Sequence, residues 1–336
     1  QSSLLTSIAV NDSVPYKAAM THGFTVDGRG NKMSKSKGNV IAPQKIINRL
    51  GSDILRLWVA STDSSSEMTV SEEILNRTSD KYRKIRNTIR FLLSNIDDYD
   101  PETFSIKDTS IELDKWIVLK AINLQKEILD HYNKFNFHII SQLIHGFCVN
   151  ELGSFYLDVI KDRQYTCKKD SAERKSAQNS MYVILQMLLS WIAPICPHTA
   201  EEAWSHVPKS SQKSIFFNKW LIINDSEIPQ TKINLDNWEK ILEIKKHVSK
   251  ELENKREKNI IGSSLDADVK ILCSDNLYNL LSEYGDELKF IFITSKVILE
   301  RENNLKDGQI YEINGENLKV EIENSKNKKC ERCWHR

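Results

Sequence analysis

The sequence predicts a multidomain chain, in which the end of an α/β domain is followed by an α-helical bundle and then by a small α/β domain. Three observations support this prediction. A strand pattern and a turn precede a helix pattern in residues 21–50, helical periodicity dominates residues 113–204, and alternating apolar residues return after residue 260. With 336 residues, the chain has room for two or three domains.

Residues 1–45 are interpreted as the end of the first α/β domain. We expect a helix at residues 2–9, a strand at 21–26 and a helix at 44–50. Asp27 and Gly28 follow the strand and favour a tight turn. Because the sequence opens within a helical pattern and stops just after a cysteine pair, we expect a fragment that is cut at both ends.

Two lysines bracket a small flexible turn directly after this strand. Lys32 and Lys35 each offer a mobile ammonium group, Ser34 and Ser36 add hydroxyl donors, and Gly38 permits backbone conformations closed to other residues. Such a loop suits a polyphosphate, whose charge develops as a leaving group departs. The alternative is an ordinary basic surface turn, which is a common feature.

Residues 46–110 are expected to link the first domain to the bundle. Residues 51–59 are apolar enough for a buried helix or strand, and a second helix is expected from about Ser71, with Glu72 and Glu73 in its first turn. This helix carries basic residues with few compensating acids: Arg77, Lys81, Arg83, Lys84, Arg86 and Arg90. RNA phosphate and a solvated helix face are both open as interpretations. Residues 101–110 are a turn-rich linker.

Residues 111–228 are predicted to form the helical bundle. Apolar stripes at helical spacing run through residues 116–132, 139–160 and 181–191, and the last helix is expected to stop before Pro194. Thr199 and Glu202 have the spacing of a capping box. The methionine and aromatic residues of these stripes are interpreted as core rather than as stacking partners for bases.

Residues 229–325 are predicted to form the small α/β domain. A charged amphipathic helix is expected at residues 237–258, with a break at 260–264. Strands are expected around 267–271, at 290–299 and at 318–322, and a helix at 277–284.

Residues 326–336 form a tail in which Cys330 and Cys333 have the spacing that lets one turn direct two thiolates at Zn²⁺. A redox pair shares this spacing but needs a strand-to-helix setting. A structural zinc site takes four ligands, so a second pair is expected beyond Arg336; His335 is a possible substitute. The other four cysteines stand singly and are expected to be reduced and mostly buried.

Charge and hydropathy exclude some classes of protein. The 47 Lys and Arg residues against 46 Asp and Glu give a formal charge of +1, which excludes a strongly basic protein but not local RNA-binding patches. No apolar run approaches the length that spans a bilayer, so no membrane association is expected.

The loop K-M-S-K-S at Lys32, Met33, Ser34, Lys35 and Ser36 resembles the signature loop of the class I aminoacyl-tRNA synthetases at all five positions. This resemblance implies a Rossmann-like catalytic domain that ends near residue 45, with ATP and Mg²⁺ as its cofactors. It implies that Lys32 and Lys35 are catalytic and stabilise departing pyrophosphate, while Ser34 and Ser36 hold the loop. His22 and Gly23 are implied to line the adenine pocket; a strand-end histidine bonded to backbone is the alternative.

The flanking segments H-G-F-T-V-D-G-R-G-N and G-N-V-I-A-P resemble the bacterial isoleucyl members of this family. The segment W-I-A-P-I-C-P-H-T-A-E-E-A-W at 191–204 resembles their helical anticodon-binding domain, and C-E-R-C-W-H resembles the start of their four-cysteine zinc tail. The resemblance implies a cytoplasmic enzyme, expected to be a monomer, that activates isoleucine with ATP and transfers it to tRNA(Ile). The valyl, leucyl and methionyl enzymes are alternatives.

The chain contains no H-I-G-H phosphate signature and no inserted editing domain. We therefore expect the polypeptide alone to be inactive in amino-acid activation. A non-catalytic tRNA-binding module is the alternative function, in which the bundle and tail hold tRNA and the lysine loop is a relic.

Overall fold

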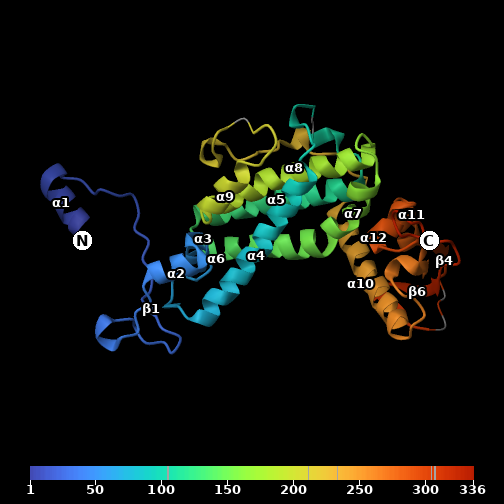
Figure 1. Cartoon of the computed structure of the whole chain (residues 1–336), viewed down its shortest axis with the longest axis horizontal. Helices are drawn as coiled ribbons and strands as arrows, with labels where there is room; N and C mark the ends of the chain where they lie inside the picture. Colours follow the sequence, from blue (N-terminus) through green and yellow to red (C-terminus); the bar gives the residue numbers. More distant parts are fainter. Residues whose placement is uncertain (104–105, 211, 233, 304, 306–307) are drawn as a thin grey trace.

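The computed structural model describes residues 1–336 except 104–105, 211, 233, 304 and 306–307. The molecule is elongated, with the lysine loop region at one end, long helices in the middle and the C-terminal domain at the other end (Figure 1). Helix α1 (Ser2–Asn11) stands apart from the rest and buries none of its residues. None of the helices in the described ranges is long and apolar enough to cross a bilayer.

The N-terminal region is built on a two-stranded parallel pairing of β1 (Thr25–Val26) with β2 (Met68–Thr69). The strand predicted at 21–26 forms only at its end. Helices α2 (Pro43–Leu50) and α3 (Ser52–Ala60) connect the two strands, so the segment at 51–59 is a helix. They enclose a small separate core, which consists of Ile46, Trp58, Met68, Val70 and Leu75.

Helix α4 (Glu72–Asn95) runs from this region into the bundle (Figure 1). It begins where predicted, because the Ser71 hydroxyl accepts a hydrogen bond from the Ile74 N–H at 3.2 Å. The prediction of few compensating acids is wrong for half of its basic residues. The ion pairs are Arg77–Glu73, Arg83–Asp80 and Arg86–Glu202. The face is therefore less positive than its sequence indicates.

The bundle contains the predicted long helices and one irregular segment. Its elements are α5 (Glu112–Asn133), α6 (Phe137–Gly146), a π-helix (Phe147–Tyr156), α7 (Leu157–Thr166), α8 (Ala172–Ile192) and α9 (Pro197–Trp204). Helix α8 is central and buried along most of its length, with Trp191 fully buried. The methionine and aromatic residues of the predicted stripes lie mainly in this core, as expected.

The capping box predicted at Thr199 is wrong. Helix α9 begins two residues earlier, at Pro197, and Cys196 occupies its N-cap position. Proline suits the first turn of a helix because it has no N–H to leave unbonded. The Thr199 hydroxyl instead donates a hydrogen bond to the buried carboxylate of Asp53 on α3, at 2.6 Å.

The C-terminal domain packs helices against a four-stranded sheet of order β4-β3-β6-β5. The strands are β3 (Ala267–Cys273), β4 (Lys296–Arg301), β5 (Ile310–Ile313) and β6 (Glu316–Asn324); the helices are α10 (Leu235–Glu257), α11 (Asp275–Ser282) and α12 (Glu287–Phe292). Strand β3 pairs in parallel with β4 and antiparallel with β6, which pairs antiparallel with β5.

The strand predicted at 290–299 is wrong in its first half. Residues 290–292 end helix α12, and Ile293 has a left-handed backbone with φ of 55° that stops the helix before β4 begins. Strand β5 was not predicted. Short 3₁₀ turns complete the described connections: Pro101–Thr103, Ile106–Asp108, Ile215–Phe217, Asp225–Glu227 and Ser264–Asp266. The predicted linker at 101–110 includes residues 104–105, which lie outside the described residues.

Candidate functional site

The lysine loop starts from a turn that is organised by one carboxylate. Asp27 Oδ1 accepts hydrogen bonds from the backbone N–H groups of Arg29 at 3.0 Å and Asn31 at 2.9 Å, directly after β1. This is the side chain to backbone bonding by which aspartate stabilises tight turns. The chain therefore reverses at Asp27 and returns along β1, where Lys32 bridges to Val26.

Asn39 closes the loop onto the same carboxylate. Its side-chain amide donates to Asp27 Oδ2 at 2.9 Å, and its Oδ1 atom accepts a hydrogen bond from the Ser34 N–H at 2.9 Å. The Asn39 amide, followed by the Asn31 N–H, lowers the pKa of Asp27 to about 2. Asp27 and Asn39 thus brace both ends of the loop. The turn predicted at Asp27 is present, whereas the bracing contact of Asn39 was not predicted.

Lys35, Ser36 and Lys37 form a single 3₁₀ turn between these braced ends. The Ser34 hydroxyl caps the turn by accepting from the Lys37 N–H at 3.3 Å, and it lies 3.1 Å from the Ser36 hydroxyl. Gly38 ends the turn with φ of 66°, in the left-handed region that favours glycine. These contacts stabilise the turn; the roles assigned to Ser34 and Ser36 at a ligand site stay predictions.

Met33 and Lys32 lie at the base of the loop. Met33 is half-buried against the small core around Trp58 and Met68, which ties the loop to α3 and β2. The Lys32 ammonium lies 3.6 Å from the centre of the Phe24 ring, in a cation–π contact. Lys35 is exposed, and no carboxylate in the described ranges forms an ion pair with Lys32 or Lys35. Both cations therefore remain available to an anionic ligand.

His22 and Gly23 lie beside the loop, where Gly23 allows a close approach of two backbone segments and His22 bonds to backbone. Gly23 passes so close to the neighbouring backbone that an added Cβ would stand 2.1 Å from the Ser66 carbonyl oxygen, which explains glycine there. The His22 ring bonds the Gly23 carbonyl oxygen at 2.8 Å, as the backbone-bonded alternative expects. His22 also lines a largely apolar cavity of about 640 Å³, together with Thr25, Trp58 and Phe137.

A buried polar contact fixes the loop region to the bundle. Asp53 on α3 accepts hydrogen bonds from the Thr199 N–H at 2.7 Å and the Thr199 hydroxyl at 2.6 Å. Arg56, one turn further along α3, donates to the carbonyl oxygens of Pro194 and Ile195, both at 2.9 Å. The end of α8 and the start of α9 therefore set the position of α3 and, through Met33, of the loop.

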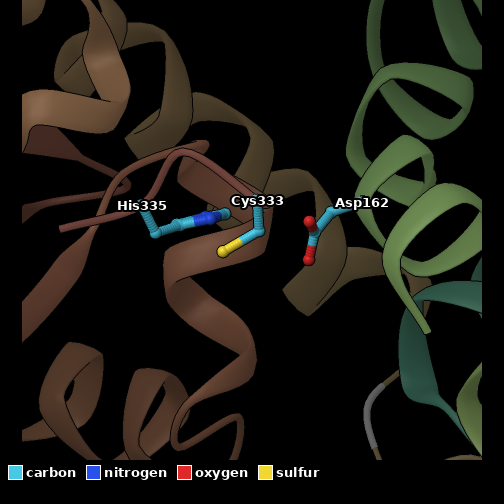
Figure 2. A group of neighbouring side chains, drawn as sticks. All are labelled: Asp162, Cys333 and His335. Atoms are coloured by element: carbon cyan, nitrogen blue, oxygen red, sulfur yellow. The ribbon is translucent and has the colours of Figure 1, made fainter. Parts of the chain in front are cut away.

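The tail brings one predicted cysteine into a group of metal-binding atoms. The Sγ atom of Cys333, a ring nitrogen of His335 and a carboxylate oxygen of Asp162 all lie within 4.8 Å of one another. Figure 2 shows Cys333 between His335 on the tail and Asp162, which projects from α7. Cys330 is exposed and lies outside this group, although the sequence predicts it as a ligand together with Cys333.

The two tail thiols differ electrostatically. The backbone N–H groups of Cys333 and Arg332 lower the pKa of Cys330, because they donate to its sulfur, whereas burial raises the pKa of Cys333. All six cysteines are free. Cys148, Cys196 and Cys273 are buried as predicted, and Cys167 is half-buried. Burial raises the pKa of the Cys148 and Cys196 thiols to about 12, which keeps them unreactive.

Comparison with known proteins finds two families and many relatives. Residues 1–71 match the class I tRNA synthetases (I, L, M and V), and residues 114–271 match the anticodon-binding domain of tRNA ligase. The isoleucine–tRNA ligase of Methylococcus capsulatus is 47% identical over 337 residues, covering 100% of this chain. Those of Shewanella pealeana and Francisella philomiragia are 46% and 47% identical over 99% and 100% of it. The chain spans 36% of the length of each of these relatives.

Proposed function

Because the chain belongs to the class I tRNA synthetases, and within them to the isoleucine–tRNA ligases, we propose that it is the part of such an enzyme that carries the ATP-phosphate loop and the anticodon-binding region. The whole enzyme would activate isoleucine with ATP to isoleucyl-adenylate and transfer it to tRNA(Ile). We assign it to the cytoplasm and expect a monomer. The identity of the relatives over the full chain supports isoleucine over valine, leucine or methionine.

In this proposal Lys32 and Lys35 stabilise the charge that develops on pyrophosphate as the isoleucine carboxylate displaces it from ATP. The observation that carries this role is a loop braced at both ends by Asp27 and Asn39, whose two signature lysines have no ion-pair partner among the described residues. Cations that interact with the negative charge of pyrophosphate only as that charge develops stabilise the transition state more than the ground state. Mg²⁺, bound with ATP, would neutralise further phosphate charge.

The two lysines would act differently within this step. Lys32 is fixed at the loop base, bridged to β1 and stacked over Phe24. Lys35 stands on the exposed 3₁₀ turn, which ends at Gly38. His22 would contact the adenine of ATP from the edge of the neighbouring cavity. Gly23 would allow its backbone to pack closely against that of Ser66 at this point.

We propose a domain layout that follows the chain order. Residues 1–45 would end the Rossmann-like catalytic domain, 46–110 would contact the tRNA stem, and 111–228 would bind the anticodon. Residues 229–325 would form the small α/β domain, and 326–336 the first half of a zinc tail. The basic residues Lys81, Lys84 and Arg90 of α4, which form no ion pair within the described ranges, support a contact with phosphate.

The tail residues fit a zinc ion in their donor chemistry. Thiolate sulfur, imidazole nitrogen and carboxylate oxygen are its usual protein ligands, and Cys333 and His335 already lie close together. Cys330 and Cys333 would hold the ion, with His335 as a further donor. The ion would fold the tail into a rigid element that supports tRNA binding, since structural zinc contributes directly to folding.

Alanine substitutions in the full-length enzyme test the catalytic proposal. Lys35→Ala and Lys32→Ala should each lower isoleucine-dependent ATP–pyrophosphate exchange by about a hundredfold to a thousandfold, the usual effect of removing one transition-state donor. Lys37→Ala is the matched control, because Lys37 stands on the same turn with the same charge. Equal effects at Lys35 and Lys37 would contradict the assigned role and favour a general basic turn.

The 336-residue polypeptide alone provides a second test. It should bind tRNA weakly, with an affinity that falls steeply as salt rises, and it should show no ATP–pyrophosphate exchange. Measurable exchange by the purified polypeptide would overturn the view that the loop needs the rest of a class I site.

A further inference from the structure

We propose that Phe216 and Phe217 form a stacking platform for unpaired bases of a bound RNA loop, with Lys213 and Lys219 contacting the flanking phosphates. This inference rests on the proposed tRNA binding of residues 111–228. It deepens that proposal, because it assigns the single-stranded part of the RNA to one surface of the chain. It depends neither on the lysine loop nor on the zinc tail.

The two phenylalanines lie on the surface, although the turn that carries them is packed. Residues Ile215–Phe217 form a 3₁₀ turn in the segment that follows α9, in the yellow part of Figure 1. The Ile215 side chain is buried, whereas Phe216 and Phe217 are 57% and 73% exposed. No phenylalanine, tyrosine or tryptophan in the described ranges is more exposed than Phe217. The core therefore takes only the isoleucine of this turn, and two adjacent aromatic rings are left free for a ligand.

Contacts with α9 fix the turn in place. The Glu201 carboxylate oxygen Oε2 accepts hydrogen bonds from the Ser214 hydroxyl at 2.8 Å and from the Ile215 N–H at 3.1 Å. The Trp204 indole N–H donates to the Gln212 carbonyl oxygen at 2.9 Å. The backbone that carries both rings is thus held before any ligand binds, so little conformational entropy is lost when bases stack on them.

The charge around the rings suits phosphate. Residues 203–223 contain three lysines and one histidine, but no aspartate or glutamate. Lys209 forms ion pairs with two carboxylates. Lys213 and Lys219 are exposed and form no ion pair within the described part of the chain. They flank the two rings in the sequence, so two cations that can contact phosphate stand within a few residues of the stacking faces.

These features favour RNA over a protein partner. Lysine is depleted in protein–protein interfaces, whereas aromatic rings beside basic residues are typical of surfaces that bind single strands. A double-stranded stem keeps its bases stacked inside, so only an unpaired loop can present bases to Phe216 and Phe217. Both residues lie within residues 114–271, which match the anticodon-binding domain of tRNA ligase. Because every base has a π-face, the platform adds affinity without selecting the base.

Binding of a tRNA(Ile) transcript to the 336-residue chain, measured by fluorescence anisotropy, tests the platform. The double variant Phe216→Ala, Phe217→Ala should bind at least about tenfold more weakly, because alanine at one stacking ring lowers affinity by about five- to a hundredfold. Phe217→Trp keeps a π-face and should bind like the wild type. Ile222→Ala is the matched control, because it removes an apolar side chain that is 61% exposed on the same segment, and it should also bind like the wild type.

Two further measurements separate stacking from general attraction. A blunt duplex of the anticodon stem, which has no unpaired loop, should bind the wild type and the double phenylalanine variant equally. Lys213→Gln with Lys219→Gln should make the slope of log affinity for tRNA against log salt shallower by about 1.4, since each phosphate contact on a single strand contributes about 0.7. All substituted side chains are exposed, so the far-ultraviolet circular dichroism should stay unchanged.

Equal tRNA affinity in the wild type and the double phenylalanine variant would overturn the platform while leaving the proposed tRNA binding standing. An equal loss of affinity for the blunt duplex would overturn it as well, because the rings would then act without unpaired bases. A wild type that is dimeric in sedimentation, with a monomeric double variant, would assign the surface to a second copy of the chain instead. A wild type that binds no tRNA would overturn the proposed tRNA binding itself, and this inference with it.

Discussion

Replacing Asn39 with alanine should disorder the lysine loop while leaving the rest of the fold intact. Asn39 holds the loop through two hydrogen bonds of 2.9 Å, to Asp27 Oδ2 and from the Ser34 N–H, and through a longer one of 3.4 Å to the Lys32 carbonyl oxygen. The alanine side chain replaces none of them. Because the loop is exposed, its freed groups can bond to water, so the global free energy of unfolding should change little.

The expected magnitude follows from the number of bonds lost. Two ordinary hydrogen bonds, partly replaced by water, correspond to about a tenfold to hundredfold fall in the population of the ordered loop. If Lys32 and Lys35 act from that ordered loop, ATP–pyrophosphate exchange by the full-length Asn39→Ala enzyme should fall by a similar factor. The loss should appear mainly in kcat, because the loop acts on the departing pyrophosphate.

Asn31→Ala is the matched control for this prediction. The Asn31 side chain reaches the same carboxylate, but its hydrogen bond to Asp27 Oδ1 is 3.4 Å long, and its stronger contact is made by its backbone. Its exchange rate should stay within about threefold of the wild type, since less than one ordinary hydrogen bond is lost. An Asn39→Ala enzyme as active as Asn31→Ala would refute the bracing role, and a large drop in melting temperature would show that Asn39 supports the fold instead.

Three further outcomes follow from the same contacts. Asp53→Ala should lower the free energy of unfolding by about 2–3 kcal/mol in urea, because the buried Thr199 N–H and hydroxyl lose their acceptor; a change no larger than that of Asp63→Ala, on an exposed loop, would count against it. Gly23→Ala should destabilise the chain by about 1–3 kcal/mol, since its Cβ would stand 2.1 Å from the Ser66 carbonyl oxygen; Gly28→Ala, whose nearest neighbour is 3.3 Å away, should be milder, and the reverse order would be inconsistent with the close approach. The turn at Asp27 should be insensitive to acid down to about pH 4. Because the pKa of Asp27 is lowered to about 2, the stabilisation by its carboxylate is fully present above the usual pKa of 3.8 and is lost as pH falls through about 2. A titration midpoint near pH 4 for the Asn31 amide signal in NMR would disprove this.

The long helices could be predicted from the sequence because their signals are local. Ser71 and Ser171 cap α4 and α8 with hydroxyls that accept from the third residue of each helix, and the apolar stripes repeat at helical spacing. The run Phe290–Phe292 was misassigned because a short apolar segment suits a strand as well as a helix. The π-helix Phe147–Tyr156 was missed because a stripe at ordinary helical spacing does not reveal a wider turn.

The candidate sites likewise contain some features with local sequence signals and others that depend on long-range contacts. The loop lysines and serines form a contiguous motif, so the sequence identifies them directly. The brace of Asp27 with Asn39 joins residues twelve positions apart, and the contact of Asp53 with Thr199 joins residues 146 positions apart. Asp162 meets Cys333 only because α7 packs beside the C-terminal domain. Such contacts depend on tertiary packing, and one sequence carries no periodic or compositional signal for them.

We propose that the loop lysines act in forming the adenylate and not in later steps. The most direct test measures two single-turnover rates in the full-length Lys35→Ala enzyme: isoleucyl-adenylate formation, and transfer of isoleucine to tRNA from preformed adenylate. We predict that formation slows by about a hundredfold or more, while transfer stays at the rate of the Lys37→Ala control. Equal slowing of both steps, or unchanged adenylate formation, would contradict the claim.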